Sequence, residues 1–252
     1  MLDKQLEDIM AIYYSMSDIH GHFNEFIDSL SKVDLSDKQS RLILLGDYID
    51  NGSQSFQVIS KIIELEKIYP KQIITLFGNH EEWFYDWLIL DKPTASAFPE
   101  TIKSFFSTVE LNYILKSNPN NLETGIRNEI RNNAKFIPFI NWFQKRYEDS
   151  RYFETENQIF VHAGIDEEAN NLWKELTSPE MFTNKFPLTT GRFHKDIISG
   201  HVASWEVAND ISYLGKIYYD SQSHYFIDGH TSQSKTIPVL AFDTITKKYH
   251  FL

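Results

Sequence analysis

Aspartate, asparagine and histidine residues recur directly after apolar runs in this chain. The set comprises Asp18, His20, Asp47, Asn79, His80, His162 and His201. Carboxylate, amide and imidazole groups suit borderline or hard divalent ions such as Mn²⁺, iron or Zn²⁺. Two such ions about 3.5–4 Å apart require one bridging carboxylate, for which Asp47 is the natural candidate. The residue types therefore predict a centre for two divalent metal ions, which could be Mn²⁺, iron or Zn²⁺.

Short apolar runs place these residues at the ends of predicted strands. The runs lie at 12–17, 42–45, 73–77, 159–161 and 196–199. Apolar residues at helical spacing follow the first two runs, and the repeated strand–helix–strand pattern predicts right-handed crossovers in a mostly parallel sheet. Because ligands bind at the carboxyl ends of the strands in such sheets, we expect the polar residues to meet at one edge.

Two later regions depart from this alternation. Residues 82–155 show helical patterns with aromatic clusters, and no linker rich in proline, glycine or serine flanks them. We interpret them as a helical insertion in a single domain that covers residues 1–252. Closely spaced β-like runs follow at 211–219, 224–227, 236–242 and 248–251. Such spacing predicts antiparallel hairpins that form a second sheet.

Composition and charge exclude several classes of protein. The 252 residues include 24 Lys and Arg against 35 Asp and Glu, a net charge of −11, which repels phosphate backbones and argues against stable nucleic-acid binding. Cysteine is absent, so there is no disulfide and no cysteine nucleophile. The N-terminal string MLDKQLEDIM lacks a signal-peptide core, and no apolar stretch is long enough to span a membrane. We therefore expect a cytoplasmic protein without a membrane partner, and the oligomeric state is left open.

Five short strings give the chain a resemblance to a known family. They are DIHGH (18–22), GDYIDNG (46–52), GNHE (78–81), VHAG (161–164) and SGH (199–201). In this order they resemble the calcineurin-like metallophosphoesterases, most of all the phosphoprotein phosphatase branch with its bacterial members and the bacterial diadenosine tetraphosphate hydrolases. The FIDGH string at 226–230 is similar to the last strand of the family. The resemblance implies an α/β fold, a four-layer α-β-β-α sandwich with a helical insertion.

The resemblance also implies a role for each matching residue. Asp18, His20 and Asp47 would hold one metal ion, whereas Asp47, Asn79, His162 and His201 would hold the second. A hydroxide that bridges the two ions would attack phosphorus in line. His80 would protonate the leaving oxygen, and Asp50 would orient His80 and stabilise its charge. These roles imply a hydrolase that needs no covalent phosphoenzyme.

The chain departs from the phosphatase branch where that branch grips phosphate. Asn51 occupies the arginine position of the GDY-x-DRG motif, and Lys174 follows Trp173 where the branch reads W-x-R. Arginine holds phosphate oxygens with a charged, planar pair of donors. Asn51, Lys174 and Arg192 are therefore the candidate substrate-binding residues. His230 is a further candidate for the pocket, and His194, His224 and His250 are expected to be surface or structural residues.

The expected activity is hydrolysis of a phosphomonoester, as in a bacterial serine/threonine protein phosphatase, with a phosphoprotein or a nucleotide as the phosphorylated substrate. A dinucleoside polyphosphate hydrolase or a phosphodiesterase is the alternative, because neither needs the arginine pair as much. A metal-stabilised scaffold without activity is the third interpretation. It predicts the loss of a metal ligand or of His80, and neither is lost.

Overall fold

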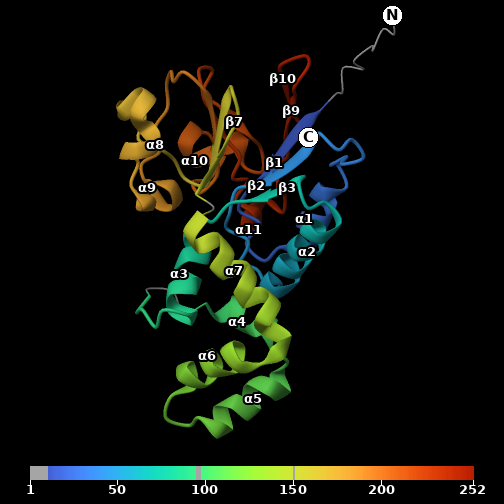
Figure 1. The fold of residues 1–252 in the computed structure, drawn as a ribbon, viewed down its shortest axis with the longest axis vertical. Helices are drawn as coiled ribbons and strands as arrows, with labels where there is room; N and C mark the ends of the chain where they lie inside the picture. The colour runs from blue at the N-terminus through green and yellow to red at the C-terminus, as the bar shows by residue number, and fades with distance from the viewer. Residues whose placement is uncertain (1–10, 95–97, 150) are drawn as a thin grey trace, which may run out of the picture.

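The computed structural model describes residues 11–94, 98–149 and 151–252. Residues 1–10, in which the sequence lacks a signal-peptide pattern, lie outside the described residues. Two five-stranded sheets form the centre of the fold, and Figure 1 shows helices on both sides of them. The strands are β1 (Ile12–Met16), β2 (Arg41–Leu44), β3 (Ile73–Thr75), β4 (Tyr152–Glu154), β5 (Gln158–Val161), β6 (Asp196–Ser199), β7 (Tyr218–Tyr219), β8 (His224–Phe226), β9 (Leu240–Asp243) and β10 (Lys248–Phe251).

The first sheet has the order β10-β9-β1-β2-β3. Strands β1, β2 and β3 are parallel, with Ser15 opposite Ile43 and Leu42 opposite Ile73. Helices α1 (Phe23–Leu30) and α2 (Ser55–Ile68) make the two crossovers. The strands are continuous apolar runs in the sequence because both faces of this sheet are covered. The predicted parallel strands and their two helices are confirmed.

The second sheet has the order β4-β5-β6-β8-β7, with β5, β6 and β8 parallel and the two edge strands antiparallel to them. The prediction that the last four β-like runs form this sheet by themselves is therefore wrong. The run at 211–219 contains the short 3₁₀ helix η3 (Ile211–Tyr213) and only the two-residue strand β7. Only β7 and β8 of those runs join the sheet, and β8 does so in parallel with β6.

The last two strands return to the first sheet. They form the antiparallel hairpin that was predicted, but β9 pairs with β1, so that Tyr14 lies opposite Ala241. Hairpin spacing specifies that two neighbouring strands pair with each other, and it carries no information about the sheet to which they add. All four residues of β9 are buried, which suits an interior position between β1 and β10.

The fold has four layers, as the resemblance implied. Ile43 and Leu45 of the first sheet pack against Phe160 and Ile198 of the second, in a core between the two sheets. Helices α1 and α2 cover the outer face of the first sheet. Helices α8 (Trp173–Leu176) and α9 (Pro179–Asn184) cover the outer face of the second, where Trp173 and Phe182 share a hydrophobic cluster with residues of β5 and β6.

A helical region joins the two sheets in the sequence. It contains α3 (Asn79–Leu88), α4 (Pro99–Phe105), α5 (Thr108–Ser117), α6 (Leu122–Asn132), the 3₁₀ helix η1 (Ala134–Phe136) and α7 (Ile137–Asp149). Figure 1 places α5 and α6 at the end of the molecule away from the sheets. Residues 152–154 of the expected insertion belong instead to β4, which pairs with β5.

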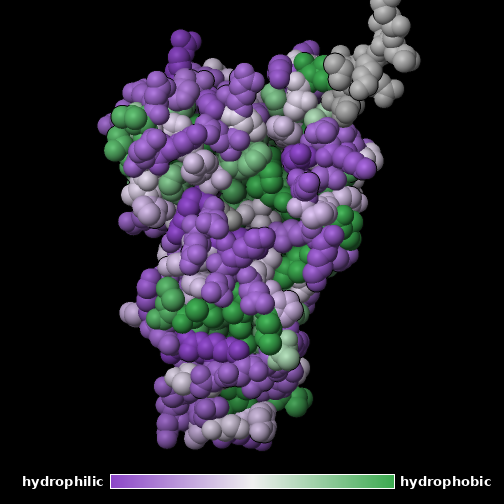
Figure 2. Space-filling model, in the orientation of Figure 1, coloured by the Kyte–Doolittle hydropathy of each residue, from purple (hydrophilic) through white to green (hydrophobic). Residues whose placement is uncertain are grey.

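Aromatic side chains form the core of this helical region. Phe84, Phe105, Phe139 and Phe143 are buried and in ring-to-ring contact, so the aromatic clusters of the sequence are packing residues. Figure 2 shows mostly hydrophilic residues on one face of the molecule, with hydrophobic residues gathered in a band across the helical region. Within the described ranges, no helix has the length and apolar character required to cross a bilayer.

Candidate metal centre

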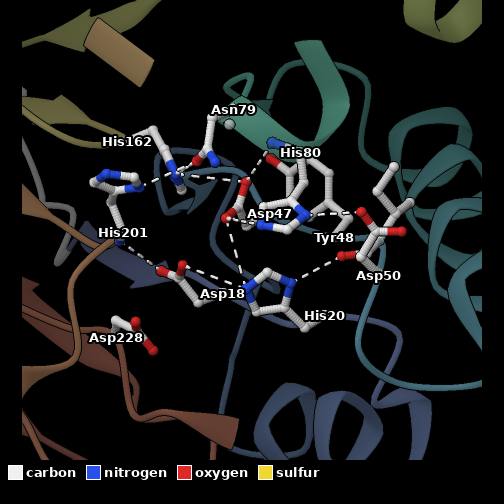
Figure 3. Close-up of polar contacts among 12 residues, drawn as sticks. Asp18, His20, Asp47, Tyr48, Asp50, Asn79, His80, His162, His201 and Asp228 are labelled. Atoms are coloured by element: carbon white, nitrogen blue, oxygen red, sulfur yellow. Dashed lines mark hydrogen bonds and ion pairs between the residues drawn. The ribbon is translucent and has the colours of Figure 1, made fainter. Parts of the chain in front are cut away.

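The loops that follow five strands bring the predicted metal ligands into one cluster. Figure 3 shows Asp18, His20, Asp47, Asn79, His80, His162 and His201 together. The loops after β1 and β2 run side by side, since the Asp18 N–H donates to the Gly46 carbonyl over 3.1 Å and the His20 N–H to the Asp47 carbonyl over 2.9 Å. The second sheet joins the cluster through the His201 N–H, which donates to Asp18 Oδ2 over 3.0 Å. The expectation that these residues meet at one edge of the fold is confirmed.

Several residues of this cluster have left-handed backbone. The φ angle is 55° at Asp18, 47° at His20, 54° at Asp47 and 69° at His201. Non-glycine residues adopt this conformation rarely and at an energetic cost, and such residues concentrate at functional sites. The loops also pack closely, because a Cβ at Gly78 would collide with the Asp47 carboxylate. The backbone of these loops is therefore strained, and the strained conformations direct the side chains toward one another.

Asp47 lies between two groups of potential ligands. Its Oδ2 is 3.6 Å from His20 Nε2, and its Oδ1 is 3.5 Å from His162 Nε2. His20, Asp47 and His80 offer ligand atoms within 4.8 Å of one another, and Asp47, His162 and His201 do the same. Each oxygen of one carboxylate thus faces a different group, which is the arrangement that a shared ligand of two ions requires.

Backbone carbonyls set the tautomers of two of the histidines. His20 Nδ1 lies 2.8 Å from the Ile49 carbonyl oxygen, and His162 Nδ1 lies 3.1 Å from that of Leu45. A carbonyl oxygen only accepts hydrogen bonds, so Nδ1 carries a proton in both rings, and Nε2 of the neutral ring can bind a metal ion. Histidine ligands in metal sites are usually oriented through the other ring nitrogen in this way. Burial lowers the pKa of His162, but the carboxylates of Asp47 and Asp18 outweigh it and raise that pKa to about 9, so metal binding there would displace the Nε2 proton.

The centre fits a cation on two observations. Asp18 Oδ1 is buried and has no hydrogen-bond partner among the described residues. His162 Nε2 and His201 Nδ1 lie 3.0 and 3.1 Å from Asn79 Oδ1, so two imidazoles and an amide oxygen converge on one point. A cation beside these groups and the buried Asp18 oxygen would satisfy them. The donor set of carboxylate, amide and imidazole suits divalent ions.

The charges of the cluster are strongly coupled. Burial raises the pKa of Asp18 to about 6. Burial also raises the pKa of Asp47, but the nearby rings of His162, His80 and His20 outweigh it and hold that pKa well below its usual range. Burial and the neighbouring His162 lower the pKa of His201 to about 4. His201 is thus neutral at pH 7, as a metal ligand must be, and Asp47 is ionised.

His80 and Asp50 form a pair beside these ligands. His80 Nδ1 lies 2.8 Å from Asp50 Oδ2, and His80 Nε2 points toward the centre, 3.9 Å from Asp47 Oδ2. Burial lowers the pKa of His80, but the carboxylates of Asp47 and Asp50 outweigh it and raise this pKa to about 9. Asp50 therefore orients the His80 ring and, together with Asp47, favours its protonated form at neutral pH.

Two supporting residues had no role in the predictions from sequence. The buried carboxylate of Glu81 accepts the backbone N–H groups of Asp47, Tyr48 and Gly78 over 2.7, 2.8 and 3.1 Å. It fixes the loop that carries the shared carboxylate. An acid three residues after the helix N-cap, as in GNHE, is the signature of a capping box and could have identified it.

Thr101 is the second supporting residue, and it belongs to helix α4 of the helical region. Its hydroxyl donates to Asp50 Oδ1 and accepts the Asp50 N–H over 2.9 Å. Thr101 is completely buried. Thr101 therefore positions the Asp50 carboxylate, which in turn orients His80. No motif surrounds Thr101 in the sequence, so only the three-dimensional structure reveals this contact.

A cavity of about 450 Å³ opens beside the cluster, and we call it the side cavity. Its lining includes the candidate ligands His20 and His201 together with Asn51, Phe186, Glu206 and His230. Asn51, one of the candidate substrate-binding residues, thus lines the side cavity. No lysine or arginine occurs among the described residues that line the side cavity.

The other two candidate substrate-binding residues lie elsewhere. Lys174, on α8, forms an ion pair with Glu154 of β4 and does not line the side cavity. Arg192 is exposed on the loop before β6 and does not line it either. Among the remaining histidines, His194 and His250 are exposed and His224 is buried, as expected for surface and structural residues.

Comparisons with known proteins agree with this geometry. The family model of the calcineurin-like phosphoesterases matches residues 14–231. The serine/threonine-protein phosphatase PP2A-like PPG1 of Candida albicans is 33% identical over 66 residues, which are 26% of this chain and 16% of that protein. The chain spans between 16% and 35% of the curated relatives it matches.

Two solved structures share the fold at low sequence identity. A protein serine/threonine phosphatase from Saccharomyces cerevisiae with similarity to human phosphatase PP5 has a TM-score of 0.56 at 10% identity, with 97% of this chain and 80% of that one covered. A putative diadenosine tetraphosphatase has a TM-score of 0.51 at 15% identity, with 97% of this chain and 94% of that one covered.

Proposed function

The chain belongs to the calcineurin-like phosphoesterase family, and we propose that it hydrolyses phosphomonoesters with two divalent metal ions, in the manner of a serine/threonine protein phosphatase. The observation that carries this proposal is the position of Asp47, whose two carboxylate oxygens face two separate groups of ligands, next to the oriented His80–Asp50 pair. The phosphorylated substrate is a phosphoprotein or a nucleotide. The chain acts as a single domain in which the helical region is an insertion.

The proposed ligands divide into two sets that share Asp47. Asp18 and His20 complete the first set, and Asn79, His162 and His201 complete the second. When bound, two divalent ions of the Mn²⁺ type supply Lewis acidity and lower the pKa of coordinated water to near neutrality. Two observations support this assignment: Asp18 Oδ1 is buried without a hydrogen-bond partner among the described residues, and His162 and His201 converge on Asn79 Oδ1.

His80 is the proposed general acid. Its Nε2 points toward the metal ligands and its Nδ1 is held by Asp50, so a proton on Nε2 is available to the leaving oxygen of the substrate. The surrounding carboxylates keep the ring protonated at neutral pH. Both groups are present and in contact, which argues against a scaffold without activity.

A phosphodiester or dinucleoside polyphosphate substrate is the second candidate. The observation that favours a phosphodiester is the lack of lysine and arginine among the described residues of the side cavity. A monoester dianion has more negative charge to hold than a diester, which carries one charge. Hydrogen bonds between neutral groups and phosphate are weaker than those from a charged guanidinium.

A substrate panel on protein of known metal content tests these proposals. The protein is loaded with Mn²⁺, iron or Zn²⁺, its metal content is measured, and hydrolysis of a nitrophenyl monoester, a nitrophenyl diester, a phosphopeptide and a dinucleoside tetraphosphate is compared. We expect two ions per chain and the highest kcat/KM for a monoester. Two bound ions without hydrolysis of any of these substrates would support the scaffold instead.

A further inference from the structure

Neutral groups must hold a phosphoryl group in the side cavity, because no described lining residue is a lysine or an arginine. The cavity is also lined by Glu206, whose carboxylate repels phosphate oxygens, and by Asp228, whose pKa is raised to about 7 by burial and by the nearby Asp18. Apart from the proposed metal ions, the groups that hold phosphate oxygens there must therefore be amide, hydroxyl or imidazole hydrogen-bond donors. His230 is the one whose orientation and proton position the structure specifies most fully.

Trp205 fixes the proton of His230. Trp205 belongs to helix α10 (Ser204–Ala208), and His230 precedes helix α11 (Thr231–Ser234). The Trp205 indole Nε1 donates to His230 Nδ1 over 3.2 Å, and the two ring planes are within 10° of parallel. An indole N–H only donates, so Nδ1 accepts and the proton of the ring is on Nε2. His230 therefore offers one N–H, on the side of the ring away from the indole.

Short contacts tie the backbone around His230 to the metal ligands. The His230 N–H donates to Asp228 Oδ1 over 2.7 Å, and the backbone of His230 is left-handed with φ of 52°. The hydroxyl of Thr231, the next residue, donates to the Asp18 carbonyl over 3.0 Å. The imidazole thus lines the side cavity together with His20 and His201 from a segment that is hydrogen-bonded to the loop of a metal ligand.

From this geometry we propose that His230 is a substrate-positioning residue, which donates its Nε2–H to a non-bridging oxygen of the bound phosphoryl group. The inference rests on the proposed function, because it assumes that the side cavity receives the phosphoryl group. His230 then supplies a neutral, directed donor in a cavity that has no guanidinium among its described lining residues. Trp205 acts through His230 by holding the required tautomer.

Binding of inorganic phosphate to zinc-loaded protein tests the donor directly. Calorimetry should show that His230→Ala raises the dissociation constant for phosphate about tenfold or more. This is the effect expected when a hydrogen bond to a charged group is lost. His230→Gln keeps an N–H donor and should bind within about threefold of the wild type. His250→Gln, at an exposed histidine on β10 outside the side cavity, is the matched control and should not change the affinity.

Nuclear magnetic resonance of ¹⁵N-labelled histidine tests the tautomer. The zinc-loaded wild type should show His230 protonated at Nε2 only, whereas Trp205→Phe should show a mixture and a loss of phosphate affinity smaller than that of His230→Ala. Three results would overturn the proposal: a proton on Nδ1 in the wild type, equal phosphate affinity in His230→Ala and the wild type, or no phosphate binding by the two-metal protein.

Different results would contradict the proposed function and the proposed role of His230. If phosphate binding depends on His230 but no ester is hydrolysed, the proposed function is wrong and His230 is still an anion contact. If esters are hydrolysed while phosphate affinity is indifferent to His230, the proposed function stands and the role of His230 is wrong. Unchanged metal content in every variant shows that an effect does not come from the metal ligands.

Discussion

The metal ligands and the side cavity are adjacent, yet the chain builds them in different ways. Asp18, Asp47 and His162 are buried and follow directly from strands, and backbone or side-chain contacts hold each of them on more than one side. The side cavity takes its lining from loops and short helices, and includes side chains as exposed as Phe186 and Glu206. The proposed reaction chemistry would therefore rest on buried residues at strand ends, and the proposed recognition on loops and short helices.

The two regions also differ in how they treat charge. Among the candidate ligands, histidines lie against carboxylates, and one buried oxygen of Asp18 has no hydrogen-bond partner among the described residues. In the side cavity, carboxylates and neutral donors are mixed, and the described lining residues include no guanidinium or ammonium group. Substitutions in the first region should change whether the reaction occurs at all. Substitutions in the second should change which ester is preferred.

The largest effect is expected at the carboxylate between the two ligand groups. Asp47→Asn replaces a charged ligand, whose oxygens face both groups, by a neutral amide. At least one metal ion should be lost and hydrolysis should fall by on the order of 10³-fold or more. Elemental analysis decides the matter. Two ions retained at wild-type affinity would show that Asp47 is not the shared ligand.

The next effect is expected at the proton donor. His80→Asn should keep both metal ions and lower turnover by about 10²–10⁴-fold for esters with poor leaving groups. For nitrophenyl esters the loss should be smaller, because nitrophenolate needs little protonation. In the wild type, the rate for a poor leaving group should decline as pH rises through the pKa of His80, since the acid is lost when the ring deprotonates. An equal loss for both leaving groups would instead indicate a structural role.

A smaller effect is expected from the helical region. Thr101→Val removes the hydroxyl that holds Asp50 and should lower turnover by about tenfold, as expected for the loss of a hydrogen bond to a carboxylate. Thr101→Ser retains the hydroxyl and should restore most of the activity. Kinetics with a poor leaving group, alongside metal analysis, measure this. A loss of metal in Thr101→Val would contradict a role that acts only through Asp50 and His80.

The smallest effect concerns ester preference in the side cavity. Asn51→Arg supplies a charged donor where the chain has a neutral amide, and should raise kcat/KM for a monoester by roughly tenfold with little change for the matching diester. Asn51 has φ of 61°, a conformation that favours asparagine, so some stability should be lost as well. Paired kinetics on the two nitrophenyl esters measure the ratio. An unchanged ratio would mean that Asn51 does not contact the phosphoryl group.

The sequence predicted the cluster of candidate ligands better than the residues that hold those ligands in place. Asp18, Asp47 and His162 were found because each comes directly after an apolar strand, and strand ends meet at one edge of a sheet. Thr101 was not found, because its contact with Asp50 spans 51 residues and depends on how α4 packs. Local sequence patterns indicate which residues lie at the end of a strand. They do not indicate which distant helix packs against those residues.

The same limit explains why the strands of the second sheet were predicted wrongly. It also explains why the sequence offered three candidate substrate-binding residues, of which only Asn51 lines the side cavity. The β9–β10 hairpin was visible as two short apolar runs, but its addition to β1 depends on contacts that span more than 200 residues. Lys174 and Arg192 were candidates on charge and sequence position alone. The structure places Lys174 against Glu154 instead, and Arg192 in an exposed position.

The pairing of β9 with β1 has a consequence for the order of folding during synthesis. Strand β1 lacks one of its two neighbours until residues 240–243 are available, and an unpaired strand edge is open to incorrect pairing. Asp18, directly after β1, likewise receives its contacts from His201 and Thr231 only when those distant segments have been made. Contacts of such long sequence separation form slowly. The nascent chain should therefore acquire its capacity to retain metal late, after most of its helices have formed.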